Sequence, residues 1–262
     1  MVLGKDIRLN RILKMGKMLC VPMDHGISSG PLGGIKDINK FISDTENSGL
    51  TCILVNKGII KILSRPINIG IIAHMSGSTS LGPDPNKKVL LGSVKGAIRL
   101  GADAVSLHIN IGSKEEPMML YSLGLIADEC NKWSIPLIAM MYPRGENIKN
   151  SNDPTTISHA ARIGAEAGAD IVKTIYSGNI DTFREVVKSC PVPIVIAGGP
   201  ASKSSTGTLE MCYNAMQAGA KGVTFGRNIF EHSNPNKIIN ALYEIIFENK
   251  KYDKVIENFK RK

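Results

Sequence analysis

The sequence contains no long hydrophobic run. No apolar stretch among its 262 residues approaches the ~20 residues that a membrane helix requires. The first residues, Met1 to Arg8, become charged too early for an export signal, so no signal peptide is expected. We therefore expect a cytoplasmic protein that has no membrane partner.

Paired cysteines are also lacking. The chain has no Cys-x-x-Cys pair, and an odd number of cysteines argues against a closed set of disulfides. The five are Cys20, Cys52, Cys130, Cys190 and Cys212. Reduced thiols in a cytosolic enzyme fit this pattern best. Cys20 and Cys52 lie in apolar, strand-like stretches, where we expect them to behave as small hydrophobic side chains.

Signatures of nucleic-acid binding are missing, although the net charge is +9 and the isoelectric point is near 9.3. Basic residues are spread along the chain, with dense patches only near the N-terminus and in the C-terminal tail. No helix-turn-helix, zinc finger or aromatic RNA-binding motif accompanies them. We expect no nucleic-acid partner, because attraction of anionic small substrates, or a solvated surface, explains the charge as well.

The sequence does contain a recurring unit, in which a helical stretch ends at a glycine and a short β-branched run follows. It occurs at residues 49–55, 101–107, 168–172 and 219–225. In each unit the glycine is expected to adopt the left-handed conformation that ends a helix. Further strands are predicted at residues 18–23, 69–74, 136–141 and 193–197.

Eight strands that alternate with amphipathic helices predict an α/β fold, a closed (β/α)₈ TIM barrel in a single domain over residues 1–262. Among the helices, residues 154–167 begin at Asp153-Pro154, a typical helix start. A short N-terminal lead-in precedes the barrel. A basic tail follows the last helix, 235–249, and is either another helix or a frayed end. An open doubly wound sheet is the alternative, although no Gly-x-Gly-x-x-Gly follows the first strand.

Lys173 is the central functional candidate, because catalytic groups of such barrels lie at the C-terminal ends of the strands. Residues 168–174 form a strand of buried Ile and Val that carries this lysine near its end. A buried lysine loses its proton more readily, which makes Lys173 a candidate nucleophile for a Schiff base with a ketone. The alternative is a rim lysine that extends to water or pairs with a carboxylate.

The nucleophilic role requires a neutral amine. A free lysine with a pKa of ~10.4 is neutral in only about one molecule in 2,500 at pH 7. We therefore expect burial and neighbouring cations to lower the pKa of Lys173 to ~7–8.

Proton transfer in such a reaction needs further groups at neighbouring strand ends. Asp24 suits a proton acceptor for a hydroxyl or carbinolamine, and Tyr142 suits a proton donor at the substrate carbon. The alternative for Asp24 is a helix cap or an ion pair with Lys57 or Lys173, and for Tyr142 a core position with a satisfied hydroxyl. Arg144 either holds the carboxylate of an acceptor or braces its loop.

Glycines follow the last two strands. They let backbone N–H groups approach an anion, and the loops after strands seven and eight of barrels commonly hold phosphate. We predict a phosphate site from Gly198, Gly199, Gly226 and Arg227, the alternative being tight turns alone. The loop from Ser76 to Lys88 is either a lid over the barrel mouth or a surface excursion.

The histidines at these strand ends suggest an alternative, a metal site. His25, His74 and His108 end three different strands, and three histidines at a barrel mouth would suit zinc. No His-x-His pair or carboxylate at ligand spacing supports this alternative, and we expect no metal. His108 is expected to be a polar residue inside the barrel beside Ser106.

Five motifs at strand ends occur in order along the chain. They are Pro22-Met23-Asp24-His25-Gly26, Met141-Tyr142-Pro143-Arg144-Gly145, Val172-Lys173-Thr174, Ala197-Gly198-Gly199-Pro200 and Gly226-Arg227-Asn228. Together they resemble the archaeal-type class I fructose-bisphosphate aldolase family, from about Pro22 to Phe230. The resemblance implies a Schiff base at Lys173, an acid/base pair of Tyr142 and Asp24, and phosphate held around the glycines and Arg227.

Within this family the chain is most similar to a transaldolase-type synthase. That resemblance implies a donor, 6-deoxy-5-ketofructose 1-phosphate, whose methyl-ketone fragment is kept as an enamine and joined to L-aspartate semialdehyde. Hydroxypyruvaldehyde phosphate leaves, and the product feeds a route to 3-dehydroquinate and the aromatic amino acids. Family members are often ring-shaped homo-oligomers, including decamers, and neither a metal nor a nucleotide cofactor is implied. Cleavage of fructose bisphosphate is the alternative activity.

The sequence departs from the family at Val55-Asn56-Lys57-Gly58, where a histidine is expected before Lys-Gly. The departure puts a contribution from the second strand in doubt but leaves the lysine chemistry intact. A non-enzymatic barrel that binds a sugar phosphate is a further alternative, although the candidate catalytic residues are all present.

Overall fold

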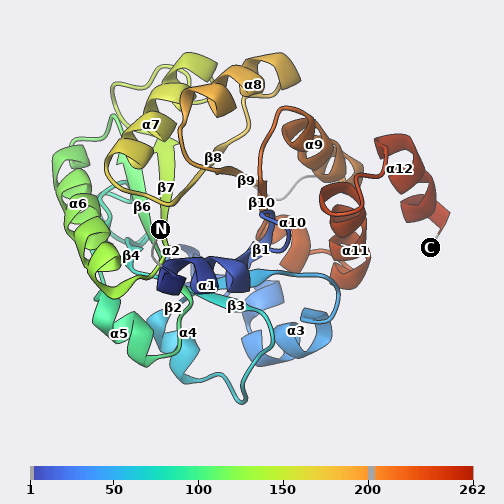
Figure 1. Ribbon diagram of the computed structural model, residues 1–262, viewed down its shortest axis with the longest axis horizontal. Helices are drawn as coiled ribbons and strands as arrows, with labels where there is room; N and C mark the ends of the chain where they lie inside the picture. The colour runs from blue at the N-terminus through green and yellow to red at the C-terminus, as the bar shows by residue number, and fades with distance from the viewer. Residues whose placement is uncertain (1–2, 200–203, 262) are drawn as a thin grey trace.

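The computed structural model describes residues 3–199 and 204–261 and contains a closed barrel of parallel strands (Figure 1). The strand order around the barrel is β1-β10-β9-β8-β7-β6-β3-β2. These strands are β1 Met18–Pro22, β2 Cys52–Asn56, β3 Gly70–His74, β6 Ala104–Ile111, β7 Leu137–Pro143, β8 Ile171–Ile175, β9 Ile194–Ala197 and β10 Gly222–Thr224. The predicted (β/α)₈ barrel is confirmed, and the closure of β1 onto β10 excludes the open doubly wound sheet.

Helices surround this barrel and follow the strands in alternation (Figure 1). They are α3 Ile38–Thr45, α4 Lys57–Lys61, α5 Val94–Arg99, α6 Glu116–Trp133, α7 Pro154–Glu166, α8 Ile180–Ser189, α9 Ser205–Gln217 and α11 Pro235–Ile246, with the shorter α2 His25–Ser29, η1 Gly33–Ile35 and α10 Arg227–Phe230. Asp153 caps α7 by accepting a hydrogen bond from the backbone N–H of Thr156, as its sequence predicts. Gly168 and Gly219 have φ of +99° and +106°, so the predicted left-handed helix ends are confirmed there.

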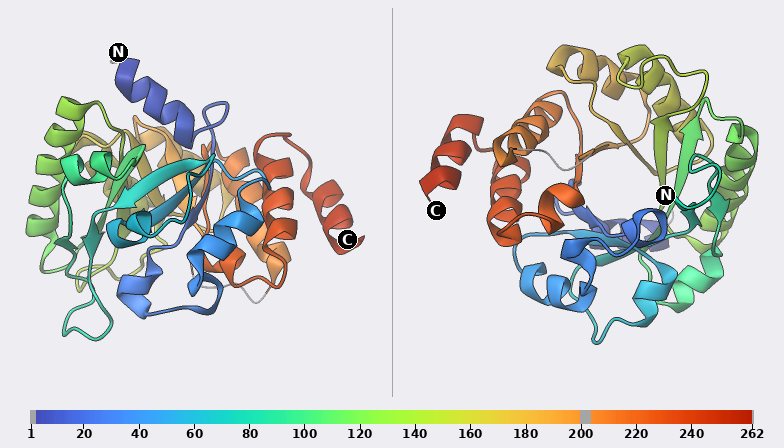
Figure 2. Two further views of the ribbon diagram at one scale, coloured as in Figure 1. Left: turned by 90° about the horizontal axis from the view of Figure 1, so that it is seen from below. Right: turned by 180° about the vertical axis from the view of Figure 1, so that it is seen from behind.

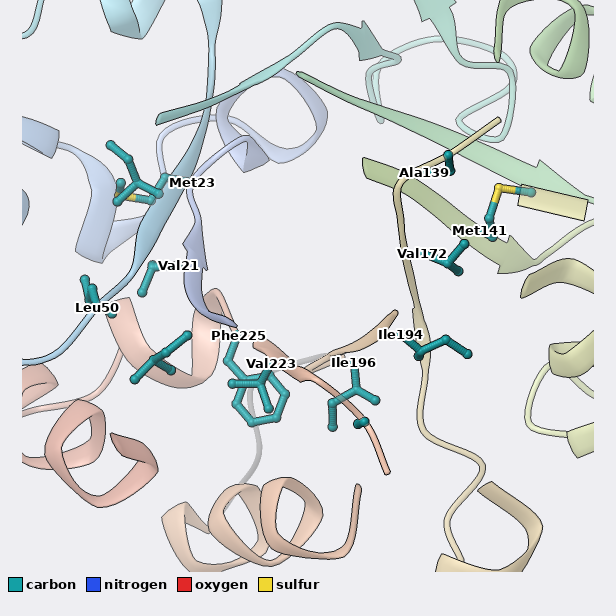
Figure 3. Close-up of a cluster of buried hydrophobic side chains, with 14 of the residues drawn as sticks. Val21, Met23, Leu50, Ala139, Met141, Val172, Ile194, Ile196, Val223 and Phe225 are labelled. Atoms are coloured by element: carbon teal, nitrogen blue, oxygen red, sulfur yellow. The ribbon is translucent and has the colours of Figure 1, made fainter. Parts of the chain in front are cut away.

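Alternation along the strands divides the core into two layers. Side chains such as Val21, Val172 and Val223 face outward and pack against the helices, as Figure 3 shows in part. Ile138 and Met140 belong instead to a smaller cluster inside the barrel. Successive strand residues point to opposite faces, so each position is assigned to the helix layer or to the barrel interior.

Two terminal helices complete the fold. Helix α1 (Leu3–Ile12) lies across one end of the barrel (Figure 1), and its fully buried Ile12 joins the interior cluster. Helix α12 (Tyr252–Arg261) lies outside α9 and α11 (Figure 2), so the basic tail is a helix rather than a frayed end. Within the described residues, no helix combines the length and apolar character needed to cross a membrane.

The segment from Ser76 to Leu90 is the main excursion from the barrel. Strands β4 (Ser76–Gly77) and β5 (Val89–Leu90) pair antiparallel at its base. The backbone N–H of Ser80 also donates to the carbonyl of Ser28, which ties the excursion to α2. It therefore returns over the ends of the strands, beside the first helical turn that follows β1.

Candidate active site

A cavity of about 510 Å³ opens at the C-terminal ends of the strands. All eight residues predicted for the site line it: Asp24, Tyr142, Arg144, Lys173, Gly198, Gly199, Gly226 and Arg227. Part of the 76–90 excursion lines it as well. The barrel therefore brings together residues that lie more than half the chain apart in the sequence.

Lys173 points into the barrel interior. It lies on β8 beside Met140 of β7 and Val195 of β9, and it faces the same side as the interior residue Ile171. Only 4% of Lys173 is exposed, which excludes the alternative of a rim lysine that extends to water. The strand alternation that buries Ile171 thus also places an amine in the cavity.

The expected lowering of the Lys173 pKa is wrong. Burial does act to lower the pKa, but electrostatic interactions with Tyr142 and Asp24 and a hydrogen bond with Tyr142 outweigh it. The net direction is upward from the ordinary value. The neighbours that the sequence predicts as proton-transfer groups therefore hold Lys173 as an ammonium, and the neutral amine arises only after one of them takes its proton.

Asp24 lies two residues after the end of β1 and is present as a carboxylate. Burial acts to raise its pKa, but the charges of His74, Lys173 and His25 outweigh burial and the pKa is lowered. Its side chain makes no capping hydrogen bond at the start of α2, so the alternative role as a helix cap is excluded. Lys57, the other partner considered for Asp24, instead donates to the carbonyl of Leu91.

Tyr142 lies on the interior side of β7 and is buried. Its ring makes an edge contact with His108 at 4.8 Å between centroids, and the guanidinium of Arg144 lies 5.3 Å from the ring centroid. Packing therefore fixes the ring, while its hydroxyl is close enough to Lys173 to influence the pKa of that lysine. A buried phenol beside an amine is suited to donate or accept a proton.

The three histidines at the barrel mouth are not gathered around one point; His25 and His74 flank Asp24, and His74 and His108 have different hydrogen-bond partners. His74 Nδ1 lies 2.9 Å from Ser106 Oγ, whereas His108 Nε2 lies 2.8 Å from Asn110 Oδ1. His108 lies two residues after Ser106 on β6 and lines the cavity, so its expected polar position inside the barrel is confirmed, while the hydrogen-bond partner of Ser106 is His74. Among residues 3–199 and 204–261, no group of three or more His, Cys, Asp or Glu side chains has an arrangement suited to a metal ion.

The glycines after β9 and β10 form one wall of the cavity. Gly199 has φ of +67°, and a Cβ atom on Gly226 would lie 2.8 Å from His25 Cε1. Arg227 donates to the carbonyl of Gly199 at 3.2 Å, and its buried Nε atom has no hydrogen-bond partner in the described part of the chain. The glycines thus make tight turns and also let the backbone pass close to neighbouring groups. Pro200 of the same motif lies outside the described residues.

Two residues of this region escape prediction from the sequence. Asn56, the position at which the family motif is broken, donates through Nδ2 to the backbone carbonyl of Asp24 at 3.1 Å, so the second strand does contribute by bracing Asp24. Lys88 lines the cavity from the 76–90 excursion. The only sequence signal for a position of Lys88 in the cavity is its place at the end of a long polar loop, because long loops between barrel elements are often functional.

A closed barrel with an interior lysine, flanked by a carboxylate and a phenol, defines the class of lysine-dependent (β/α)₈-barrel aldolases. The chain belongs to the DeoC/LacD aldolase family, whose model matches residues 18–232. It is therefore an enzyme of the aldolase class.

Relatives with established names agree with this assignment. Over 260 residues the chain is 43% identical to 2-amino-3,7-dideoxy-D-threo-hept-6-ulosonate synthase 1 of Archaeoglobus fulgidus, covering 98% of this chain and 96% of that protein. It is 35% identical to 2-amino-4,5-dihydroxy-6-oxo-7-(phosphonooxy)heptanoate synthase of Streptomyces griseus, covering 93% and 90%. Among solved structures, a Schiff-base-forming fructose-1,6-bisphosphate aldolase superposes with a TM-score of 0.88 at 30% identity, covering 93% and 100%.

Proposed function

We propose that this protein is a 2-amino-3,7-dideoxy-D-threo-hept-6-ulosonate synthase that acts through a Schiff base at Lys173. The observation that carries the proposal is the burial of Lys173 between Asp24 and Tyr142, in a chain whose relatives from Archaeoglobus fulgidus and Halobacterium salinarum, at 43% and 39% identity, bear this name. The donor is 6-deoxy-5-ketofructose 1-phosphate, and the acceptor is L-aspartate semialdehyde.

The reaction begins when the Lys173 ammonium loses its proton. Asp24 is the acceptor, because its lowered pKa keeps it ionised at neutral pH. The amine then attacks the keto carbon next to the methyl group, Tyr142 protonates the resulting hydroxyl, and loss of water leaves an iminium. The positive nitrogen makes the neighbouring carbon–carbon bond easier to break.

Carbon–carbon cleavage follows from that iminium. Tyr142, which gave up its proton when water was lost, takes the proton of the hydroxyl on the leaving carbon. The bond electrons enter the iminium to give an enamine, and hydroxypyruvaldehyde phosphate departs. The enamine carbon then attacks the aldehyde carbon of L-aspartate semialdehyde, whose oxygen takes a proton from Tyr142. Hydrolysis of the new iminium releases the seven-carbon amino keto acid; Tyr142 regains its proton from the attacking water, and Asp24 returns its proton to the amine of Lys173.

Anionic groups of the substrates are held at the rim of the cavity. We assign two anion-accepting regions, one formed by Arg227 and the backbone around Gly198, Gly199 and Gly226, and one that contains the guanidinium of Arg144. Support comes from the unpartnered Nε of Arg227 and from the location of this wall after the last two strands. No metal step is needed, because the iminium of Lys173 is the electron sink.

Borohydride trapping tests the covalent step. With the deoxyketo sugar phosphate present, borohydride is expected to leave a stable mass adduct on the peptide that contains Lys173, and EDTA is expected not to reduce its yield. Lys173→Met should abolish the adduct and lower turnover by at least about 10³-fold, while Lys221→Met, at an exposed position, should leave both unchanged. An adduct on another peptide, or activity lost on chelation, would contradict the mechanism.

Cleavage of fructose 1,6-bisphosphate is the second candidate function. The specific observation in its favour is the structural similarity to a Schiff-base-forming fructose-1,6-bisphosphate aldolase, and the same lysine and glycine wall would serve both reactions. Incubation with the deoxyketo sugar phosphate plus L-aspartate semialdehyde is expected to yield the amino keto acid. Rapid release of triose phosphate from fructose 1,6-bisphosphate alone would favour the second candidate instead.

The cellular setting of this activity is also proposed. We place the enzyme in the cytoplasm, in the route to 3-dehydroquinate and the aromatic amino acids, as a single-domain homo-oligomer that binds no nucleic acid. The support is the family resemblance and the absence of a nucleic-acid motif in the sequence. Light scattering of the purified protein tests the oligomer, and a shift assay at physiological salt tests nucleic-acid binding.

A further inference from the structure

Lys88 is held over the cavity by hydrogen bonds within the 76–90 excursion. Its Nζ atom donates to Ser78 Oγ at 2.5 Å, and Ser78 in turn donates to the carbonyl of Pro85. Asn110 of β6 donates through Nδ2 to the carbonyl of Asn86 at 2.8 Å, which ties this part of the excursion to the barrel. These hydrogen bonds therefore fix the position of the Lys88 ammonium at the cavity.

Lys88 and Arg144 both line the cavity without a carboxylate partner. Neither side chain forms an ion pair with Asp or Glu within residues 3–199 and 204–261, whereas the adjacent Lys87 pairs with Glu115 at 3.3 Å. Partial burial lowers the pKa of Lys88, and the charge of Arg144 lowers it further, so the two cations are close enough to repel each other. An anion placed between them would relieve that repulsion.

These two cations lie across the barrel mouth from the glycine wall. Lys88 belongs to the connection between β3 and β6, and Arg144 follows β7, whereas Gly198 and Gly226 follow β9 and β10. Lys173 on β8 lies between the two groups. The chain thus offers two cationic or anion-accepting regions, one on each side of the reacting amine.

Tyr142 indicates which region faces the carbon–carbon bond. Arg144 lies over the ring of Tyr142, and Tyr142 is the group proposed to protonate the aldehyde oxygen. A proton donor must be within hydrogen-bond reach of that oxygen, so the aldehyde partner extends toward Arg144 and Lys88. The substituent on the other side of the keto carbon then extends toward the glycine wall; it is a methyl group in the proposed donor and a phosphate-bearing carbon in fructose 1,6-bisphosphate.

We propose that Lys88 and Arg144 form an anion site for the aldehyde partner, which first holds the phosphate of the leaving aldehyde and then the carboxylate of the amino-acid semialdehyde. This inference rests on the proposed function. The leaving and entering aldehydes occupy the same place beside the enamine in succession, and each carries its anionic group a few bonds beyond the aldehyde carbon. One flexible lysine paired with a planar guanidinium accommodates both a phosphate and a carboxylate.

Lys88→Met tests this site, with Lys87→Met as the matched control. Hydroxyacetone serves as a neutral donor, and L-aspartate semialdehyde is compared with propanal, which has no carboxylate. In Lys88→Met the ratio of kcat/KM for the semialdehyde to that for propanal is expected to fall about 10- to 100-fold, the effect of one lost charge-assisted hydrogen bond. In Lys87→Met the ratio is expected to stay at the wild-type value, because Lys87 faces Glu115 outside the cavity.

Binding of L-homoserine, the unreactive alcohol counterpart of the semialdehyde, tests the site without any chemistry. Calorimetry is expected to show that wild type and Lys87→Met bind homoserine with equal affinity. The affinity of Lys88→Met is expected to be at least about 10-fold lower. Equal losses on both acceptors, or equal homoserine affinity in all three proteins, would overturn the anion site. A wild type that binds homoserine in a Lys88-dependent way but forms no borohydride adduct at Lys173 would instead overturn the proposed function and leave the anion site standing.

Discussion

Nε2 of His74 lies 3.7 Å from Oδ2 of Asp24, and Nδ1 of His25 lies 3.7 Å from Oδ1 of the same carboxylate. Burial lowers the pKa of both histidines, so they are neutral at neutral pH and become charged only in acid. They gain that charge before Asp24 is protonated and then stabilise its ionised form. The carboxylate is therefore kept ionised over a wide pH range.

Asp24→Asn is expected to lower kcat by about 10²- to 10⁴-fold, because it removes the proton acceptor with little change of shape. Wild-type Asp24 has a pKa below its ordinary 3.8 and stays ionised at all higher pH. The ratio of wild-type to variant activity should therefore be constant between about pH 5 and 8. A pH–rate profile of both proteins checks this, and a ratio that changes with a pKa near 6 would assign the base to another residue.

Tyr142→Phe is expected to keep the packing against His108 and to remove only the hydroxyl. Transfer should slow by about 10²- to 10⁴-fold, while the midpoint of unfolding changes little. Loss of the hydroxyl also removes the hydrogen bond that raises the pKa of Lys173, so that pKa should fall in the variant. Burst kinetics and the pH dependence of borohydride trapping measure the two effects, and a variant with wild-type turnover would reduce Tyr142 to a core residue.

Gly226→Ala is expected to destabilise the protein by about 1–3 kcal/mol, the usual cost of overpacking. The new Cβ atom would lie 2.9 Å from the backbone oxygen of Pro22, which cannot move without shifting β1. Gly58→Ala is the control, because its Cβ atom would meet nothing within 4 Å. Chemical denaturation compares the two, and equal midpoints would show that the contact with β1 is easily relaxed.

Acidification is expected to destabilise the fold before the carboxylates titrate. The pKa values of His25, His74 and His108 are lowered from 6.5, chiefly by burial, so the unfolded chain binds protons that the folded protein does not. Stability should therefore fall as pH drops below about 6.5, by up to about 1.4 kcal/mol per pH unit for each histidine that stays neutral.

Denaturation midpoints at pH 7 and pH 5 measure this loss. In His108→Gln, which keeps a polar side chain beside Asn110, the loss between the two pH values should shrink, whereas Lys87→Met should behave as wild type. A wild-type midpoint that is flat between pH 5 and 7 would mean that the histidines take up protons in the folded state at their ordinary pKa.

Local sequence patterns were sufficient for the architecture. Glycine at the end of each αβ unit permits the left-handed backbone that ends a helix, and period-two alternation assigns Lys173 to the same face as Ile171. The strands and the candidate strand ends therefore follow from neighbours in the chain. Cys20 and Cys52 are buried and free, as their apolar surroundings predict. The N-terminal helix α1 and the Ser76–Leu90 hairpin lack such a pattern and were not anticipated as elements.

Properties that depend on charges brought together across the barrel were decided only by the tertiary structure. The sequence by itself determined a (β/α)₈ barrel with a lysine, an aspartate and a tyrosine at strand ends, because those follow from short-range periodicity. It did not determine the direction of the Lys173 pKa, the pairing of His74 with Ser106, or the reach of Lys88 into the cavity. Each of these depends on distances and burial set by strands and loops that are remote in sequence, and electrostatic energies change steeply with both.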